Sequence, residues 1–205
     1  YKKLKSIANA FNKDHKFTAL YGFEWSHPIL GHFNVINTKK YTSAIIKPTM
    51  GSLMRWLGKR DWAFGRFNHP GRINRKYWPY EFTKLRVYNK ALHNVVGIEM
   101  WNKNDRIKSY LETRGSFREG LNFLENAISE GWYVGAVGGQ DNHDADWGLR
   151  NDWRVGVWAT QLTRDEIINA YFARRTFATE DKNAAISFRI NGAEMGSRLT
   201  AGTYP

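Results

Sequence analysis

Cysteine is absent from the 205 residues of this chain. The absence excludes disulfides, cysteine nucleophiles and zinc–thiolate sites, so any bound metal has to be held by histidine, aspartate and glutamate. No apolar run reaches the roughly 18 residues that a membrane-spanning helix needs, and repeats and low-complexity segments are lacking as well. With 42% apolar and 15% aromatic residues, we expect one large domain with a core of its own.

Acidic residues are few relative to basic ones, with 19 Asp and Glu against 31 Lys and Arg and a formal net charge of +12. This excess favours anionic partners: phosphate esters, nucleic acid, acidic glycans or a membrane surface. The basic residues are scattered, apart from the clusters "KKLK" and "RINRK", and a solvated basic surface explains them equally well. The compartment stays undecided, since neither an initiator methionine nor a signal peptide is present. Because the opening "YKKLKSIANAFN" is typical of a helix already under way, we expect a fragment of a longer protein.

Apolar periodicity and turn residues predict strands that alternate with helices. Helices are expected over 2–12 and 49–59, from Ser116 to near Gly131 and from Thr163 through Phe172; strands are expected over 17–25, 32–38, 62–71, 94–102, 132–139 and 154–160. Two of the helices open with a capping box, Ser116 with Glu119 and Thr163 with Glu166. The closing segment "AISFRINGAEMGS" predicts a hairpin that turns at Asn191-Gly192. The fold class is therefore α/β, layered or barrel-like, and the hairpin is expected to begin an appended β domain.

Reactive side chains follow the predicted strands in a recurring way. Glu24 closes the first strand, His69 follows "FGRF", Glu99 lies near the end of "VVGIEM", and Asp141 and His143 follow "VGAV". In α/β barrels the carboxyl ends of the strands converge on one site. Carboxylates and imidazoles that meet there need a cation to offset their repulsion and desolvation, which predicts a site for a divalent metal.

Two further features bear on this site. Residues i and i+2 of extended backbone point the same way, so Asp141 and His143 can reach one cluster, and His32 adds a nitrogen eight residues after Glu24. Each signal has a plain structural explanation when taken alone, since an "HP" histidine often belongs to a turn and a strand-end glutamate often caps or pairs with an arginine. His15 and His93 are expected at the surface, and His27 lies near the site without a defined role.

Five segments in this order, "GFEWSHPILGHFNVINT", "NHPG", "GIEMWN", "GGQDNH" and "RRTFAT", resemble the polymerase and histidinol phosphatase (PHP) superfamily. The branch they resemble most is that of the metal-dependent phosphoesterases related to carbaryl hydrolase. The resemblance covers about Phe17 to Gly196. It implies a distorted (β/α)7 barrel over residues 1–183, incomplete at its amino-terminal end and followed by the hairpin of residues 184–205.

The resemblance also implies a ligand set and a reaction. It implies that two or three divalent metals (zinc, manganese or iron) are held by Glu24, His32, His69, Asp141 and His143, with Glu24 and Asp141 as the catalytic carboxylates; Glu99 is a weaker candidate. The implied reaction is hydrolysis of a small phosphate ester by metal-activated water. Arg72 and Arg174 are the candidates for orienting the phosphate, with Arg150 and Arg175 as further ones. The family's first motif, His-x-His, is missing from this chain.

Two other functions are compatible with the sequence. Nine tryptophans interleaved with basic residues, as in "RDWAFGRF" and "NRKYWPY", suit a non-catalytic domain that binds nucleic acid or another polyanion. The missing His-x-His also suits a degenerate barrel, a structural or carbohydrate-associated domain with the remnant of a site. Substrate and oligomeric state have no signature in the chain.

Overall fold

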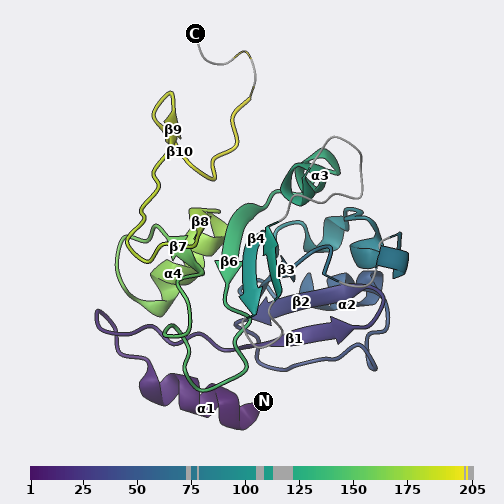
Figure 1. Cartoon of the computed structure of the whole chain (residues 1–205), viewed down its shortest axis with the longest axis horizontal. Coiled ribbons are helices and arrows are strands. Elements are labelled where there is room, and N and C mark those ends of the chain that lie inside the picture. The colour runs from purple at the N-terminus through teal and green to yellow at the C-terminus, as the bar shows by residue number, and fades with distance from the viewer. Residues whose placement is uncertain (73–74, 78, 105–108, 113–121, 201, 203–205) are drawn as a thin grey trace.

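The computed structural model describes the chain except residues 73–74, 78, 105–108, 113–121, 201 and 203–205, drawn as a grey trace in Figure 1. The side chains of Arg75 and of residues 103–121 are also left undescribed. Four α-helices are present in the described part: α1 Lys2–Phe11, α2 Met50–Leu57, α3 Phe123–Ser129 and α4 Arg164–Phe172. Three short 3-10 helices, η1 Arg75–Tyr77, η2 Glu81–Thr83 and η3 Asn89–Ala91, lie between β3 and β4. No helix in the described part has both the length and the apolarity to cross a bilayer.

A mixed six-stranded sheet forms the centre. Strand β2 Gly31–Ile36 pairs antiparallel with β1 Gly22–His27 on one side and with β3 Phe64–Asn68 on the other. Strand β4 Val95–Asn104 pairs in parallel with β3 and with β6 Gly135–Gly139. Strand β5 Ser109–Glu112 pairs with the end of β4. Two antiparallel pairs complete the strands: β7 Arg154–Val157 with β8 Thr176–Thr179, and β9 Arg189–Ile190 with β10 Ala193–Glu194.

The two faces of this sheet bury different clusters. One face carries Trp25, Phe33 and Phe67, which pack with the apolar sides of α2 and α3. The other face buries Phe64, Val96 and Val137 under Ile168 and Tyr171 of α4. The chain is therefore a three-layer α/β fold. On the α4 side only one end of the sheet is apolar, and the other end carries polar side chains.

Most of the predicted elements are present, with shifted ends. Helix α2 begins at a capping box of Thr49 with Ser52, and α4 begins at Thr163, although the Glu166 carboxylate accepts a hydrogen bond from Thr160 instead of closing the predicted box. Helix α3 begins after Asn122; the box predicted at residues 116–119 lies outside the described residues. The predicted hairpin turn is confirmed, because Asn191 and Gly192 both have positive φ between β9 and β10.

The closed barrel is not seen. Within the described residues the sheet is open, running from β1 to β6 without a pairing that joins its edges. The mixed α/β class with parallel strands is confirmed, and barrel closure is not. The β9–β10 hairpin projects from the body in Figure 1, and the segment before it is bonded to the body by Trp158 Nε1, which donates to the Ile186 carbonyl oxygen (2.6 Å). A domain boundary at residue 184 stays a prediction.

Candidate metal centre

Three side chains converge at the polar end of the sheet. Glu24, His32 and His69 each offer one ligand atom, and these atoms lie within 4.8 Å of one another. Oε1 of Glu24 is 3.6 Å from Nδ1 of His32 and 3.8 Å from Nε2 of His69. The two imidazole rings meet edge to face with their centres 5.0 Å apart. A carboxylate between two imidazoles is a donor set that zinc, manganese and iron accept.

Strand pairing brings these residues together. Ser26 pairs with His32 and Glu24 pairs with Asn34, so Glu24 and His32 are diagonal neighbours on one face of the β1–β2 ladder. His32 also pairs with Asn68, the last residue of β3, and His69 follows directly. The expectation that Glu24 closes its strand is wrong, since β1 runs over Gly22–His27 and Glu24 lies inside it. An antiparallel hairpin, rather than two parallel strand ends, positions Glu24 beside His32.

Glu24 is held as a carboxylate. It accepts hydrogen bonds from Asn68 Nδ2 (2.7 Å) and Ser26 Oγ (2.8 Å). Burial raises the pKa of Glu24, but the neighbouring imidazoles and these two donors outweigh burial and lower the pKa from 4.5 to about 2. The side chain is 31% exposed. Glu24 is therefore charged, ordered and still accessible to a cation at neutral pH.

His32 is held as a neutral ring. Burial lowers its pKa from 6.5 and outweighs the charge of Glu24, which acts in the opposite direction; the charge of His69 lowers it further. Metals bind the neutral imidazole, so a lowered pKa keeps His32 available as a ligand at pH 7.

His69 is the most buried of the three, with its side chain 4% exposed. It has a φ of 31°, at the start of a turn that Gly71 continues with a φ of 84°. The backbone N–H of His69 donates to Oε2 of Glu99 (2.7 Å). Among the described residues Nδ1 of His69 has no hydrogen-bond partner.

Glu99 supports the turn that presents His69. Its carboxylate is 3.1 Å from Nη2 of Arg66 and also accepts a bond from Asn102 Nδ2 (2.8 Å). With the backbone of His69 as a third partner, both oxygens of this buried group are occupied. Glu99 thus acts on the site through His69, and it is not part of the three-residue cluster.

The structure places Asp141 and His143 beside the cluster and not within it. Asp141 follows β6 with a φ of 47°. Arg72 donates hydrogen bonds from Nη1 to the Asp141 carboxylate and from Nη2 to Oδ1 of Asn102. The charge of Asp141 still reaches His32. His143 is 64% exposed, and its Nε2 is 3.9 Å from Oδ1 of Asp141. Arg72, a predicted phosphate contact, is here the ion-pair partner of a predicted ligand.

The structure does not bring Arg174 to the site. It is 6% exposed and donates to the carbonyls of Tyr133, Phe172 and His93. Tyr133 and His93 lie just before β6 and β4, whereas Asp141 follows the other end of β6. Arg150 is paired with Asp144 and Asp146, and Arg175 lies 3.9 Å from Glu194.

The remaining histidines have other surroundings. His27 accepts the backbone N–H of Ile29 and of Leu30 at Nδ1, so it shapes the β1–β2 turn. His15 and His93 are exposed, as predicted.

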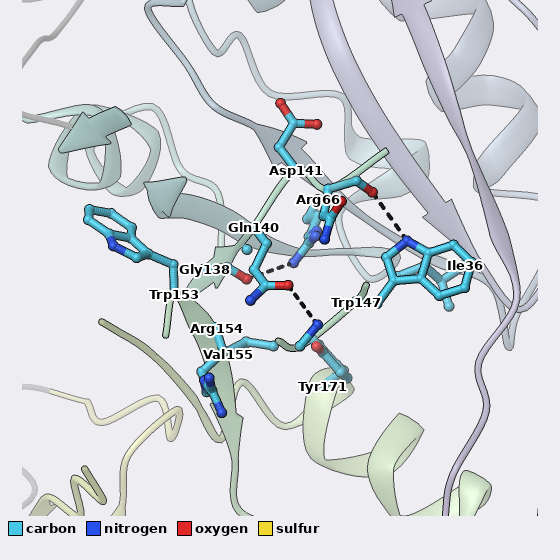
Figure 2. A pocket seen from close by; sticks show the side chains of 13 residues that line it. Ile36, Arg66, Gly138, Gln140, Asp141, Trp147, Trp153, Arg154, Val155 and Tyr171 are labelled. Atoms are coloured by element: carbon cyan, nitrogen blue, oxygen red, sulfur yellow. Dashed lines mark hydrogen bonds between the residues drawn. The ribbon is translucent and has the colours of Figure 1, made fainter. Parts of the chain in front are cut away.

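A hollow of about 430 Å³ lies beside Asp141 (Figure 2). Its walls combine aromatic and aliphatic side chains with two arginines: Ile36, Arg66, Trp147, Trp153, Arg154, Val155 and Tyr171. Arg66 donates to the Gly138 carbonyl oxygen (3.5 Å) and Trp147 Nε1 to the Asn142 carbonyl oxygen (3.3 Å). The hollow offers apolar surface next to the polar end of the sheet.

Sequence reasoning missed Glu81. This residue begins η2 and has no exposed surface. Burial raises the pKa of its carboxyl from 4.5 to about 7, against the lowering effects of a bond from the Gly71 backbone and the charge of His69. The stretch "YWPYEFTKL" shows no strand or helix period. Its one usable signal is a lone acid between aromatic residues.

Comparisons with known proteins add little to the geometry. No family model matches the chain. An uncharacterized protein of Chlamydia pneumoniae is 23% identical over 228 residues, which cover all of this chain and 35% of that protein, so the chain spans about a third of the relative's length. The crystal structure of a two-domain protein from Bacteroides vulgatus, containing a predicted PHP-like metal-dependent phosphoesterase, is similar over 79% of this chain and 44% of its own, with 20% identity and a TM-score of 0.48.

Proposed function

We propose that this chain is the larger part of a metal-dependent hydrolase domain of the PHP type, and that it acts on small phosphate esters. The observation that carries the proposal is the cluster of Glu24, His32 and His69. These residues fit a divalent cation: one carboxylate stays ionised, one imidazole stays neutral, and the donor atoms face one another across less than 5 Å. A divalent cation bound there supplies Lewis-acid activation of water and of a phosphoryl oxygen.

The chain's own groups have distinct tasks in this proposal. Glu24 and the two histidines hold the cation, and Glu99 fixes the backbone of His69. Asp141 and His143 are proposed as the residues that would complete the ligand set, in which case a cation would replace Arg72 as the partner of Asp141. Arg72 would then keep its bond to Asn102 and have its other terminal guanidinium nitrogen open to the phosphate. The hollow of Figure 2 accommodates the apolar part of the ester against Trp147 and Tyr171.

The direct test is metal content followed by turnover. The chain, purified without chelator or nickel, is assayed for zinc, manganese and iron by elemental mass spectrometry, and then for hydrolysis of p-nitrophenyl phosphate and bis(p-nitrophenyl) phosphate. We expect near-stoichiometric metal that is lost in His32→Ala and in His69→Ala. His15→Ala is the matched control, because His15 is exposed and outside the cluster.

The result that would overturn the proposal is a wild-type chain that takes up none of these ions when they are supplied. Metal uptake without turnover of either ester would keep the centre and reject the phosphoesterase activity. Activity should fall at acid pH, because protonated imidazoles no longer bind the cation.

A second candidate function is polyanion binding, favoured by a hollow beside α2. The hollow measures about 440 Å³, and five of its seven lining residues are cationic: Lys47, Arg55, Lys59, Arg60 and Lys90. None of the lining residues is acidic. The guanidinium of Arg60 lies over the ring of Trp56, 3.6 Å from its centre, which orders one of the charges. Helix α2 packs on the face of the sheet opposite the metal centre, so this surface would act separately.

Its test is binding of a fluorescent oligothymidylate at rising salt, with and without EDTA. Affinity that falls steeply with salt, ignores EDTA and is lost in Lys59→Glu supports polyanion binding by this face. Equal affinity of the Lys59→Glu chain would reject it.

A further inference from the structure

Two buried polar atoms next to the metal centre have no hydrogen-bond partner among the described residues. One is Nδ1 of His69 and the other is Oε1 of Glu81. Their residues are 3% and 0% exposed, so water does not reach them from the surface. A buried donor and a buried acceptor left open are costly, and such groups in native proteins call for a partner.

Glu81 lies between the two backbone segments that carry the histidine ligands. Its Oε2 accepts the N–H of Gly71 (3.0 Å), two residues after His69. A Cβ placed on Gly31, the residue before His32, would be 3.2 Å from Cγ of Glu81. The charge of His69 acts on the Glu81 carboxyl. The carboxyl therefore lies near enough to the imidazole for the charge of His69 to act on it, although no hydrogen bond or ion pair joins these two described residues in the structure.

The backbone after Glu81 is strained. Phe82, Thr83, Lys84 and Leu85 have φ of 47°, 53°, 55° and 60°, the left-handed region that side chains disfavour. Phe82 and Leu85 are buried in the core, and the N–H of Phe82 donates to the Leu30 carbonyl oxygen (3.0 Å). Four such residues in succession persist only where the surroundings over-determine them, and strain of this kind gathers at functional sites. Here the strained turn fixes the position of Glu81.

We propose that Glu81 is a positioning residue of the metal centre: its Oε1 and the Nδ1–H of His69, both unpaired among the described residues, form a hydrogen bond when the two side chains close on each other, and this bond directs the Nε2 lone pair of His69 toward Glu24 and His32. The inference rests on the proposed function, in which Nε2 of His69 binds the cation. Ligating histidines commonly donate their second N–H to a carboxylate, which fixes the tautomer and raises the basicity of the ligand.

The test compares the wild-type chain with Glu81→Gln. Glutamine keeps the volume and the acceptor for Gly71, but it presents an NH₂ group where His69 needs an acceptor. The tautomer of His69 is read from imidazole ¹⁵N shifts at pH 8 in the metal-free chain, and zinc affinity is measured by competition with a chromophoric chelator. Glu130→Gln, on an exposed carboxyl, is the matched control.

We expect the Nδ1–H tautomer in the wild type, its loss in Glu81→Gln, and a 10- to 100-fold weaker affinity of that variant for zinc. Glu81→Asp should recover part of the affinity, which a merely structural role would not predict. An unchanged tautomer or unchanged zinc affinity in Glu81→Gln would overturn the inference. A wild-type chain that binds no zinc, manganese or iron would instead reject the proposed function, and the tautomer of the metal-free chain would still show whether Glu81 orients His69.

Discussion

Replacing Glu81 by glutamine should stabilise the metal-free chain above neutral pH, although we expect it to weaken metal binding. The carboxyl has no exposed surface, and its pKa rises from 4.5 to about 7 on folding. A group whose pKa is raised in the folded state takes up protons on folding. Its contribution to stability is therefore fully present below pH 4.5 and is lost as the pH rises to about 7.

The magnitude follows from the two pKa values. The interval between 4.5 and about 7, at about 1.4 kcal/mol for each pH unit, corresponds to about 3 kcal/mol. Glutamine cannot ionise, so Glu81→Gln avoids this cost. Relative to the wild type, the variant should gain up to about 3 kcal/mol in the free energy of unfolding between pH 4 and pH 8, with less than about 1 kcal/mol of that gain by pH 5. A hydrogen bond from the Nδ1–H of His69 to the carboxylate lowers the pKa of Glu81 and makes the gain smaller.

The assay is urea denaturation of both chains in EDTA at pH 4, 5, 6, 7 and 8, followed by tryptophan fluorescence. Glu130→Gln serves as the control, because its carboxyl is exposed. A stability difference that does not change with pH would refute the argument, since it would mean that Glu81 titrates alike in the folded and unfolded chains. If the stability difference between Glu81→Gln and the wild type rises with pH as expected, the native glutamate lowers the stability of the metal-free chain while it orients His69. Residues at functional sites often lower stability in this way.

Three further outcomes are expected. A metal supplied at 100 times its dissociation constant should raise the free energy of unfolding by about 2.7 kcal/mol; differential scanning fluorimetry should show the shift in the wild type but not in His32→Ala. Glu99→Ala should lose about 3–5 kcal/mol in urea denaturation, because Arg66 would keep a buried charge without its partner, and a loss below 1 kcal/mol would contradict that role. Lys84→Gly should gain up to about 1 kcal/mol in the same measurement, since glycine adopts its φ of 55° without the cost of a Cβ, and a loss would show that the lysine side chain contributes.

Local patterns predicted the elements because they depend on neighbours in sequence. The alternation of Phe33 and Val35 with polar residues defines β2, and Asn191-Gly192 supplies the two positive φ values of its turn. The barrel could not be predicted in this way, because closure is a pairing between distant strands. Glu24 shows the limit within one element: "FTALYGFEW" is apolar enough for a strand, yet pairing with β2 sets the true start at Gly22 and carries the strand to His27.

The candidate site also contains residues that strand pairing places and residues that distant side-chain contacts place, and only the first kind could be predicted. Glu24, His32 and His69 were predicted from residue type and order, and adjacent strands bring them together. Asp141 and His143 lie on the loop after β6, where the orientation of a side chain depends on its contacts and not on strand register. There Arg72 donates to the Asp141 carboxylate. Arg174 was predicted from a motif, but its place is set by the three carbonyls to which it donates.

The ion pair of Arg72 with Asp141 occupies a carboxylate that the proposed metal centre would use. An arginine beside a carboxylate and an amide neutralises the negative charge that a cation would otherwise offset. Both groups are largely buried, so the pair contributes to the fold only while each has a partner. If a cation takes over Asp141, the released guanidinium keeps its bond to Asn102 and has one face open to an anion. This one exchange would give the metal centre a further carboxylate and would leave Arg72 available to bind a phosphate. The loop after β6 would therefore change its contacts on metal binding, whereas Glu24, His32 and His69 would keep the positions that β1, β2 and β3 give them.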